Sequence, residues 1–138
     1  MASEIHTEGL QYLLEVALSE EQSVPTSFHV GLCTDESPAE DASLGDLTEV
    51  TGSGYARQTV TSNDTDVTSA AAGTNDRKAT FKEVTFTATG TWDTANTVFV
   101  ATSADDSGKL LWSAPLSTPR TLNNGDTLTV APAFQLNG

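Results

Sequence analysis

The fold is decided by residues 84–134, VTFTATGTWDTANTVFVATSADDSGKLLWSAPLSTPRTLNNGDTLTVAPAF. At the start of this stretch Val84, Phe86 and Ala88 alternate with threonines, and a period of two indicates a half-buried strand. Residues 98–101 form an unbroken apolar run, as in a strand that is covered on both faces. Breaks rich in Gly, Asn and Asp separate the runs and have the composition of turns. An antiparallel sheet with an apolar face needs a second layer to cover it, so this stretch predicts a β-sandwich.

One helix and two further strands are predicted upstream. Residues 4–19 carry apolar side chains at spacings of three and four, which is typical of an amphipathic helix. Residues 26–34 and 55–61 alternate as strands do. Between the predicted strands, residues 35–54 form a long acidic loop, and residues 62–78 form a second polar loop with room for one short strand.

We therefore predict a mainly β protein, an antiparallel β-sandwich of jelly-roll or immunoglobulin-like type with one N-terminal α-helix. A chain of 138 residues is long enough for one core. The prediction is a single domain over residues 1–138, with the helix and a linker in 1–24 and the sandwich in 25–138. The predicted core comprises Leu10, Leu14, Phe28, Val30, Leu32, Val60, Phe86, Val98, Val100, Leu110, Trp112, Leu128 and Val130.

The charge of the chain is strongly negative. Six Lys and Arg stand against 19 Asp and Glu, which gives a net charge of −13. This balance argues against direct binding of nucleic acid and of anionic membrane surfaces, because both need Lys and Arg. No apolar run is long enough to span a membrane. The acids are scattered, which favours a surface adapted to salt, as in a haloarchaeal or marine setting, over one acidic patch for a basic partner.

The residues give no positive sign of an enzyme. The chain has one Cys and two His, and it lacks the common nucleotide-binding, zinc-protease and serine-hydrolase motifs. We therefore expect no catalytic residue, cofactor or metal, and the acidic loops are the one place where a structural Ca²⁺ or another cation is considered. Trp92 and Trp112 suit a sugar-binding platform, but core or interface roles are more common for Trp in strands. Arg57 is expected to pair with a carboxylate, and Asn63 begins a glycosylation sequon.

The order of segments resembles a family of small virion proteins of tailed phages and archaeal viruses, which carry the labels head decoration or phage tail fibre protein. The resemblance covers nearly the whole chain. Its most specific pieces are GYARQ at 54–58 and LLWSAPLSTPRTLNNGDTL at 110–128. Neither piece is catalytic, and both look like signatures of a fold. The resemblance implies a β-sandwich that assembles on the surface of a virion.

From this resemblance we expect a virion structural protein, most of all a capsid decoration or cement protein on the outer capsid surface of a tailed virus of a halophilic or marine host. One alternative is a tail tip, fibre or baseplate component that contacts the host surface, and another is a carbohydrate-binding module. The expected partners are copies of the chain itself, with a trimer favoured, and the major capsid protein or tail proteins. The helix or the tail at 131–138 is expected to make the contacts between subunits. The predicted interface residues are Leu10, Leu13, Tyr55, Arg57, Trp92 and Phe134.

Overall fold

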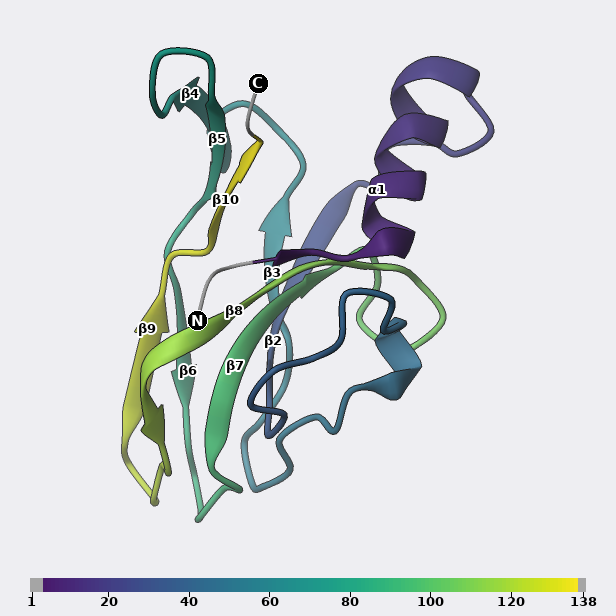
Figure 1. Cartoon of the computed structure of the whole chain (residues 1–138). Coiled ribbons are helices and arrows are strands. Elements are labelled where there is room, and N and C mark those ends of the chain that lie inside the picture. The colour runs from purple at the N-terminus through teal and green to yellow at the C-terminus, as the bar shows by residue number, and fades with distance from the viewer. Residues whose placement is uncertain (1–3, 137–138) are drawn as a thin grey trace.

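A computed structural model of the chain describes residues 4–136. Figure 1 shows a β-rich body from which two prongs project, one helical and one built from strands. The strands are β1 (Glu4–Ile5), β2 (Ser27–Cys33), β3 (Gln58–Thr61), β4 (Val67–Ala71), β5 (Arg77–Phe81), β6 (Val84–Thr87), β7 (Ala95–Ala101), β8 (Leu110–Arg120), β9 (Thr127–Val130) and β10 (Ala133–Leu136). The helical segments are α1 (Thr7–Leu14), the π-helical turn η1 (Glu15–Ser19) and the 3₁₀ turn η2 (Leu44–Asp46).

The strands form three antiparallel sheets. The largest has the order β1-β8-β7-β2-β3, and the smaller ones have the orders β10-β5-β4 and β6-β9. Only two residues separate β5 from β6, and only two separate β9 from β10, so the small sheets follow one another as a bent second layer. These layers confirm the predicted mainly β, antiparallel sandwich with one N-terminal helix.

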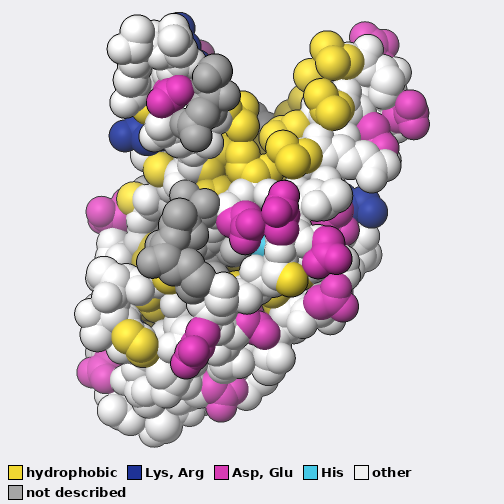
Figure 2. Space-filling view, in the orientation of Figure 1, with side chains coloured by type: hydrophobic (Ala, Val, Ile, Leu, Met, Phe, Trp, Pro, Cys, Tyr) yellow, Lys and Arg dark blue, Asp and Glu magenta, His cyan; other side chains and the backbone are white. Residues whose placement is uncertain are grey.

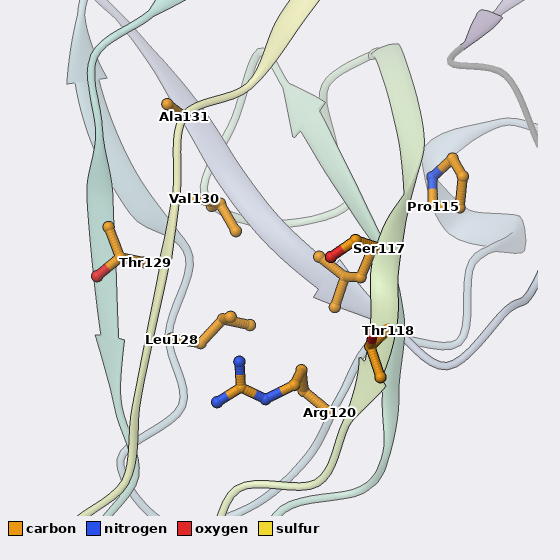
Figure 3. Close-up of a pocket in the computed structure, with 9 residues that line it drawn as sticks. Pro115, Ser117, Thr118, Arg120, Leu128, Thr129, Val130 and Ala131 are labelled. Atoms are coloured by element: carbon orange, nitrogen blue, oxygen red, sulfur yellow. The ribbon is translucent and has the colours of Figure 1, made fainter.

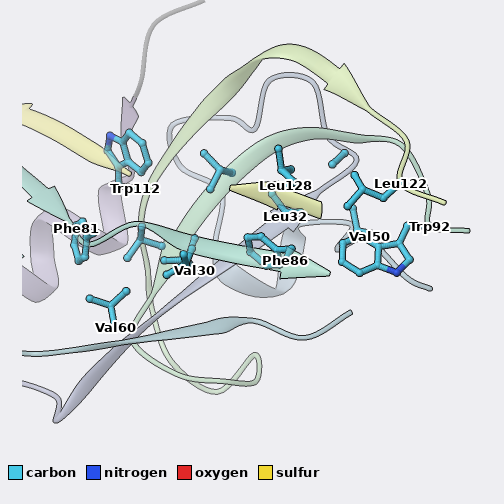
Figure 4. Close-up of a cluster of buried hydrophobic side chains, with 14 of the residues drawn as sticks. Val30, Leu32, Val50, Val60, Phe81, Phe86, Trp92, Trp112, Leu122 and Leu128 are labelled. Atoms are coloured by element: carbon cyan, nitrogen blue, oxygen red, sulfur yellow. The ribbon is translucent and has the colours of Figure 1, made fainter. Parts of the chain in front are cut away.

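The main core fills the space between the layers. Val30, Phe86 and Trp112 belong to this cluster, as Figure 4 shows. A second cluster, which includes Phe99 and Leu44, lies on the opposite face of the large sheet beneath the acidic loop. Strand β7 is therefore covered on both faces, as its unbroken apolar run predicts.

The predicted helix over 4–19 is wrong at its start and in the face that it buries. Glu4 and Ile5 pair with β8, and α1 begins only at Thr7. The helix lies so close to β8 that a Cβ at Gly9 would come within 2.5 Å of the Leu111 carbonyl oxygen. Tyr12 shares this buried face, and its hydroxyl donates to the Ser23 carbonyl at 2.8 Å.

Two of the predicted core residues are consequently at the surface. Leu10 is 42% exposed and Leu14 is 58% exposed. The closest approach of a helix to a sheet goes to the smallest side chain, so Gly9 sets the buried face and turns these leucines outward. Phe28 and Val130 are half-buried against the core, and the other predicted core residues are buried.

Two strand boundaries also differ from the prediction. Pairing in the segment predicted at 55–61 begins only at Gln58, because Tyr55 and Arg57 lie in the turn before β3. The polar segment 62–78 contributes the short strand that the sequence allowed, β4, as well as the first residues of β5. Among residues 4–136, no helix has the length and apolar character that a membrane span requires.

Candidate functional site

An apolar cavity, here called the notch, lies between α1 and the β10-β5-β4 sheet. Figure 2 shows hydrophobic side chains gathered in the notch and along the side of the helix that faces it. The cavity has a volume of about 210 Å³. It is lined by Leu13, Ser69, Arg77, Lys78, Ala79, Phe134 and Leu136. The fold thus brings Leu13 and Phe134, two predicted interface residues from opposite ends of the chain, to one site.

Exposed apolar surface is concentrated around this notch. Within residues 4–136, the large hydrophobic side chains that are exposed are Leu10, Leu14, Leu18, Val24 and Leu136. Four of them belong to the helical prong and the turn after it, and the fifth ends β10 beside the notch. Leu18 is 77% exposed. Soluble monomers rarely leave such residues clustered, and clusters of this kind mark contact sites.

The two sides of the notch differ in charge. Residues 1–56 contain 11 of the 19 acids and none of the six basic residues, which leaves eight acids and six basic residues for 57–138. The helical prong and the turn after it carry Glu15, Glu20 and Glu21, whereas Arg77 and Lys78 lie on β5 across the notch. The acids are scattered as predicted, but the basic residues are not, so the surface is polarised.

Arg57 is the centre of a clamp that joins three loops. Its Nε and Nη2 donate to the two carboxylate oxygens of Glu49, both at 2.9 Å. Nη2 also donates to Asp106 Oδ1 at 2.7 Å, and Nη1 donates to the carbonyl of Asp105 at 2.6 Å. The guanidinium lies 5.1 Å from the ring centre of Phe99, and the Arg57 side chain is only 4% exposed. The expected pairing with a carboxylate is confirmed, and the contacts of Arg57 are made inside the chain.

Tyr55 belongs to the same clamp. Its hydroxyl donates to Glu49 Oε2 at 2.5 Å and accepts from the Leu32 amide at 2.9 Å. Burial, reinforced by the hydrogen bond to Glu49, raises the pKa of Tyr55 above its usual range. The GYARQ segment therefore fixes a turn against β2 and the acidic loop, and the structure gives Tyr55 and Arg57 a role within the fold rather than on an outer contact surface.

Both tryptophans are core residues. Trp92 and Trp112 are each 3% exposed. The Trp92 indole packs edge-on against Tyr55 and donates to the Ser53 carbonyl at 2.8 Å. A sugar platform needs an exposed ring face, and an interface residue needs exposed surface. Burial therefore removes the basis for the sugar-binding alternative and for placing Trp92 in the interface.

The histidines and acids do not converge on an ion. His6 is fully buried, where its Nδ1 donates to the Ala39 carbonyl at 3.0 Å and its Nε2 is hydrogen-bonded to Ser113 Oγ at 2.7 Å. In the acidic loop, Asp35 accepts from the Thr48 amide and Asp46 accepts from Ser43. Within residues 4–136, no group of three or more His, Cys, Asp or Glu is placed to hold a metal, so the geometry gives no support for the Ca²⁺ considered from the sequence.

A second groove separates the end of β8 from β9 and has a volume of about 520 Å³. Figure 3 shows Arg120 reaching across it toward Leu128. Pro115 pairs with Thr97 and Arg120 pairs with Ala95, so the residues between them bulge away from β7. None of the predicted interface residues lies here.

Sequence reasoning missed two kinds of site residue. His6 and Glu8 act on distant backbone: Glu8 Oε1 accepts from the Leu44 amide at 3.0 Å and from the Leu110 amide at 2.5 Å. Arg77 and Lys78 gain their place beside the notch only because β4, β5 and β10 pair. The absence of Lys and Arg from residues 1–56 is a sequence signal that could have pointed to the polarised surface.

Residues 9–137 match the family described as Podophage GP4 fiber I protein gp80, and the match covers 129 of the 138 residues (137 − 9 + 1). The chain belongs to this gp80 family. Both segments that carried the resemblance, 54–58 and 110–128, lie inside the match. No curated protein matches the chain.

The gp80 family confirms the predicted class of phage virion proteins at the level of the family. Its description names a phage fibre. Of the roles predicted from the sequence, the tail fibre alternative is therefore better supported than capsid decoration. The decoration label, the archaeal virus and the halophilic host receive no support from the gp80 match.

Proposed function

We propose that this protein is a non-catalytic structural subunit of a tail fibre of a tailed phage. The observation that carries the proposal is the match to the gp80 fibre family over nearly the whole chain. In this proposal the protein is held in place by copies of itself, as a trimer or another ring, and by neighbouring tail proteins. It needs no cofactor.

The interior of the fold suits such a role. A fibre subunit must transmit force without losing its shape, so its loops have to be fixed. The Arg57 clamp fixes the loops that carry Glu49 and Asp106, and Glu8 fixes the backbone at Leu44 and Leu110. Buried polar networks in which the partners are satisfied make a structure rigid. The exposed apolar residues around the notch supply contact surface.

The location in the virion tests this proposal. We expect gold-labelled antibodies against the protein to mark the tail region of intact particles, and quantitative gels of purified virions to give few copies per particle. Particles that lack the protein should keep intact heads and lose a tail appendage. Labelling spread over the head, with many copies per particle, would instead establish a decoration protein and overturn the fibre placement.

A further inference from the structure

We infer that the notch is a self-association site that receives the helical prong of a second copy of this chain. The receiving surface consists of the notch lining, with Leu13, Phe134 and Leu136 as its apolar part and Arg77 and Lys78 as its basic part. The entering segment is 14–24, LEVALSEEQSV. This inference deepens the proposed function and rests on it for its biological setting.

The entering segment carries exposed apolar side chains that could pack against the apolar lining of the notch. Leu14, Leu18 and Val24 are 58%, 77% and 61% exposed. With Leu10 on the preceding turn, residues 10–24 hold four of the five large hydrophobic side chains that are exposed within residues 4–136. Burying such side chains is the main favourable contribution to association. The apolar floor of the notch offers a surface on which they can be buried.

Charge complementarity selects a second copy as the occupant. The entering segment carries Glu15, Glu20 and Glu21 and no basic residue, whereas the notch presents Arg77 and Lys78. Complementary charges across an interface fix its register and discriminate against wrong partners. Asp76, which also lies on this side, accepts a hydrogen bond from Gln135 of its own chain.

The same copy carries both halves of the contact, close together on one side of the molecule. Two copies can therefore close reciprocally, each prong entering the other notch, or the contact can repeat from copy to copy into a ring. In both arrangements every contact joins the acidic prong of one copy to the basic notch of another. The mass of the assembly distinguishes the two arrangements.

Analytical ultracentrifugation of the purified full chain tests the inference, at about 0.15 M salt, where the Debye length is about 8 Å and long-range repulsion is screened. We expect the mass of the wild-type protein to rise with concentration to a multiple of 14.4 kDa. Leu18→Asp is expected to weaken association at least about tenfold, because it removes a buried apolar contact. Circular dichroism should be unchanged, since Leu18 is mostly exposed.

Charge exchange then identifies the surfaces that meet. Lys78→Glu and Glu21→Lys should each weaken association several-fold, and the double variant should recover most of the loss, because each contact again joins opposite charges. Lys109→Glu makes the same change in net charge as Lys78→Glu at an exposed residue that does not line the notch, and it should have no effect. A wild-type chain that stays monomeric overturns the inference. Association that Leu18→Asp weakens and Lys78→Glu does not would show helix-to-helix pairing and would also overturn it. Neither result bears on where the virion carries the protein.

Discussion

The guanidinium of Arg57 binds the carboxylate of Glu49 through two parallel hydrogen bonds, each 2.9 Å long. Side-chain exposure is 4% for Arg57 and 28% for Glu49. The fork of Arg matches a carboxylate in two places, which neither Lys nor a point charge can do. This pair closes the acidic loop against the turn before β3.

Arg57→Ala is expected to lower the free energy of unfolding by about 3–5 kcal/mol, because it leaves Glu49 without its buried partner. Arg57→Lys should recover only part of this loss, since Lys cannot form the fork. Asp106→Ala, which removes a partner whose side chain is 66% exposed, should cost less than 1 kcal/mol, roughly as surface pairs do. Urea denaturation measures all three variants, with Lys109→Ala as a control for an exposed cation. Equal effects of Arg57→Ala and Asp106→Ala would contradict the clamp.

Gly9→Ala should destabilise the protein by about 1–3 kcal/mol, because the added methyl group meets the Leu111 backbone and must push α1 away from β8. In a free helix the same change would stabilise by about 1 kcal/mol, so the sign of the effect is diagnostic. Gly45→Ala is the matched control, since a Cβ there meets nothing within 4 Å. Denaturant unfolding of both variants checks the prediction, and a stabilised Gly9→Ala variant would show that the helix does not pack this closely.

Trp92→Ala is expected to cost about 3–5 kcal/mol of stability, as truncation of a core aromatic does. Trp92→Phe should cost less, because it keeps most of the packing against Tyr55 while losing the hydrogen bond to Ser53. Thermal melts and a glycan array are the measurements. A Trp92→Ala variant that remains as stable as the wild type and loses binding to a glycan would restore the carbohydrate-binding interpretation.

Cys33 should not react with a thiol reagent at pH 8 while the protein is folded. The side chain is fully buried, and burial, aided by the negative charge of Asp35, raises the pKa of its thiol to about 12. The thiolate is the reactive form, so we expect modification only at the rate of unfolding, and rapid modification in urea. Fast reaction of the native chain would place Cys33 at the surface.

The same shift in pKa predicts a loss of stability in alkaline solution. As pH rises, the unfolded chain loses the Cys33 proton near its ordinary pKa of about 8.5, while the folded chain holds it up to about 12. The free energy of unfolding should therefore decrease between these two pH values. The decrease should be shallower in Cys33→Ala, and a profile that is identical in the two proteins would exclude Cys33 as its source.

The melting temperature should rise as NaCl increases from dilute buffer. A net charge of −13 repels itself, and the Debye length falls from about 30 Å at 0.01 M to about 10 Å at 0.1 M salt. Calorimetry in NaCl and in choline chloride separates charge screening, which both salts share, from binding of Na⁺ in particular. A melting temperature that falls with either salt would contradict the prediction.

The sandwich could be predicted because its signals are local. The alternation from Val84 and the unbroken run at 98–101 depend only on which neighbouring side chains are apolar, and β6 and β7 form as predicted. The pairing of Arg57 with a carboxylate could also be predicted, since a strongly acidic chain leaves few arginines without one. Which carboxylate it binds depends on two loops that lie far apart in the sequence.

The sequence by itself determined the class of fold, the excess of acid and the family, because strand periodicity, residue counts and the segments at 54–58 and 110–128 are properties of the chain in order. Only the tertiary structure decided which face of α1 is buried. Gly9 meets the backbone of β8, and a close approach of this kind exists only after both elements are placed. The same packing turns Leu14 and Leu18 outward and sets Lys78 beside Phe134, so the notch arises from contacts between segments that the sequence keeps apart.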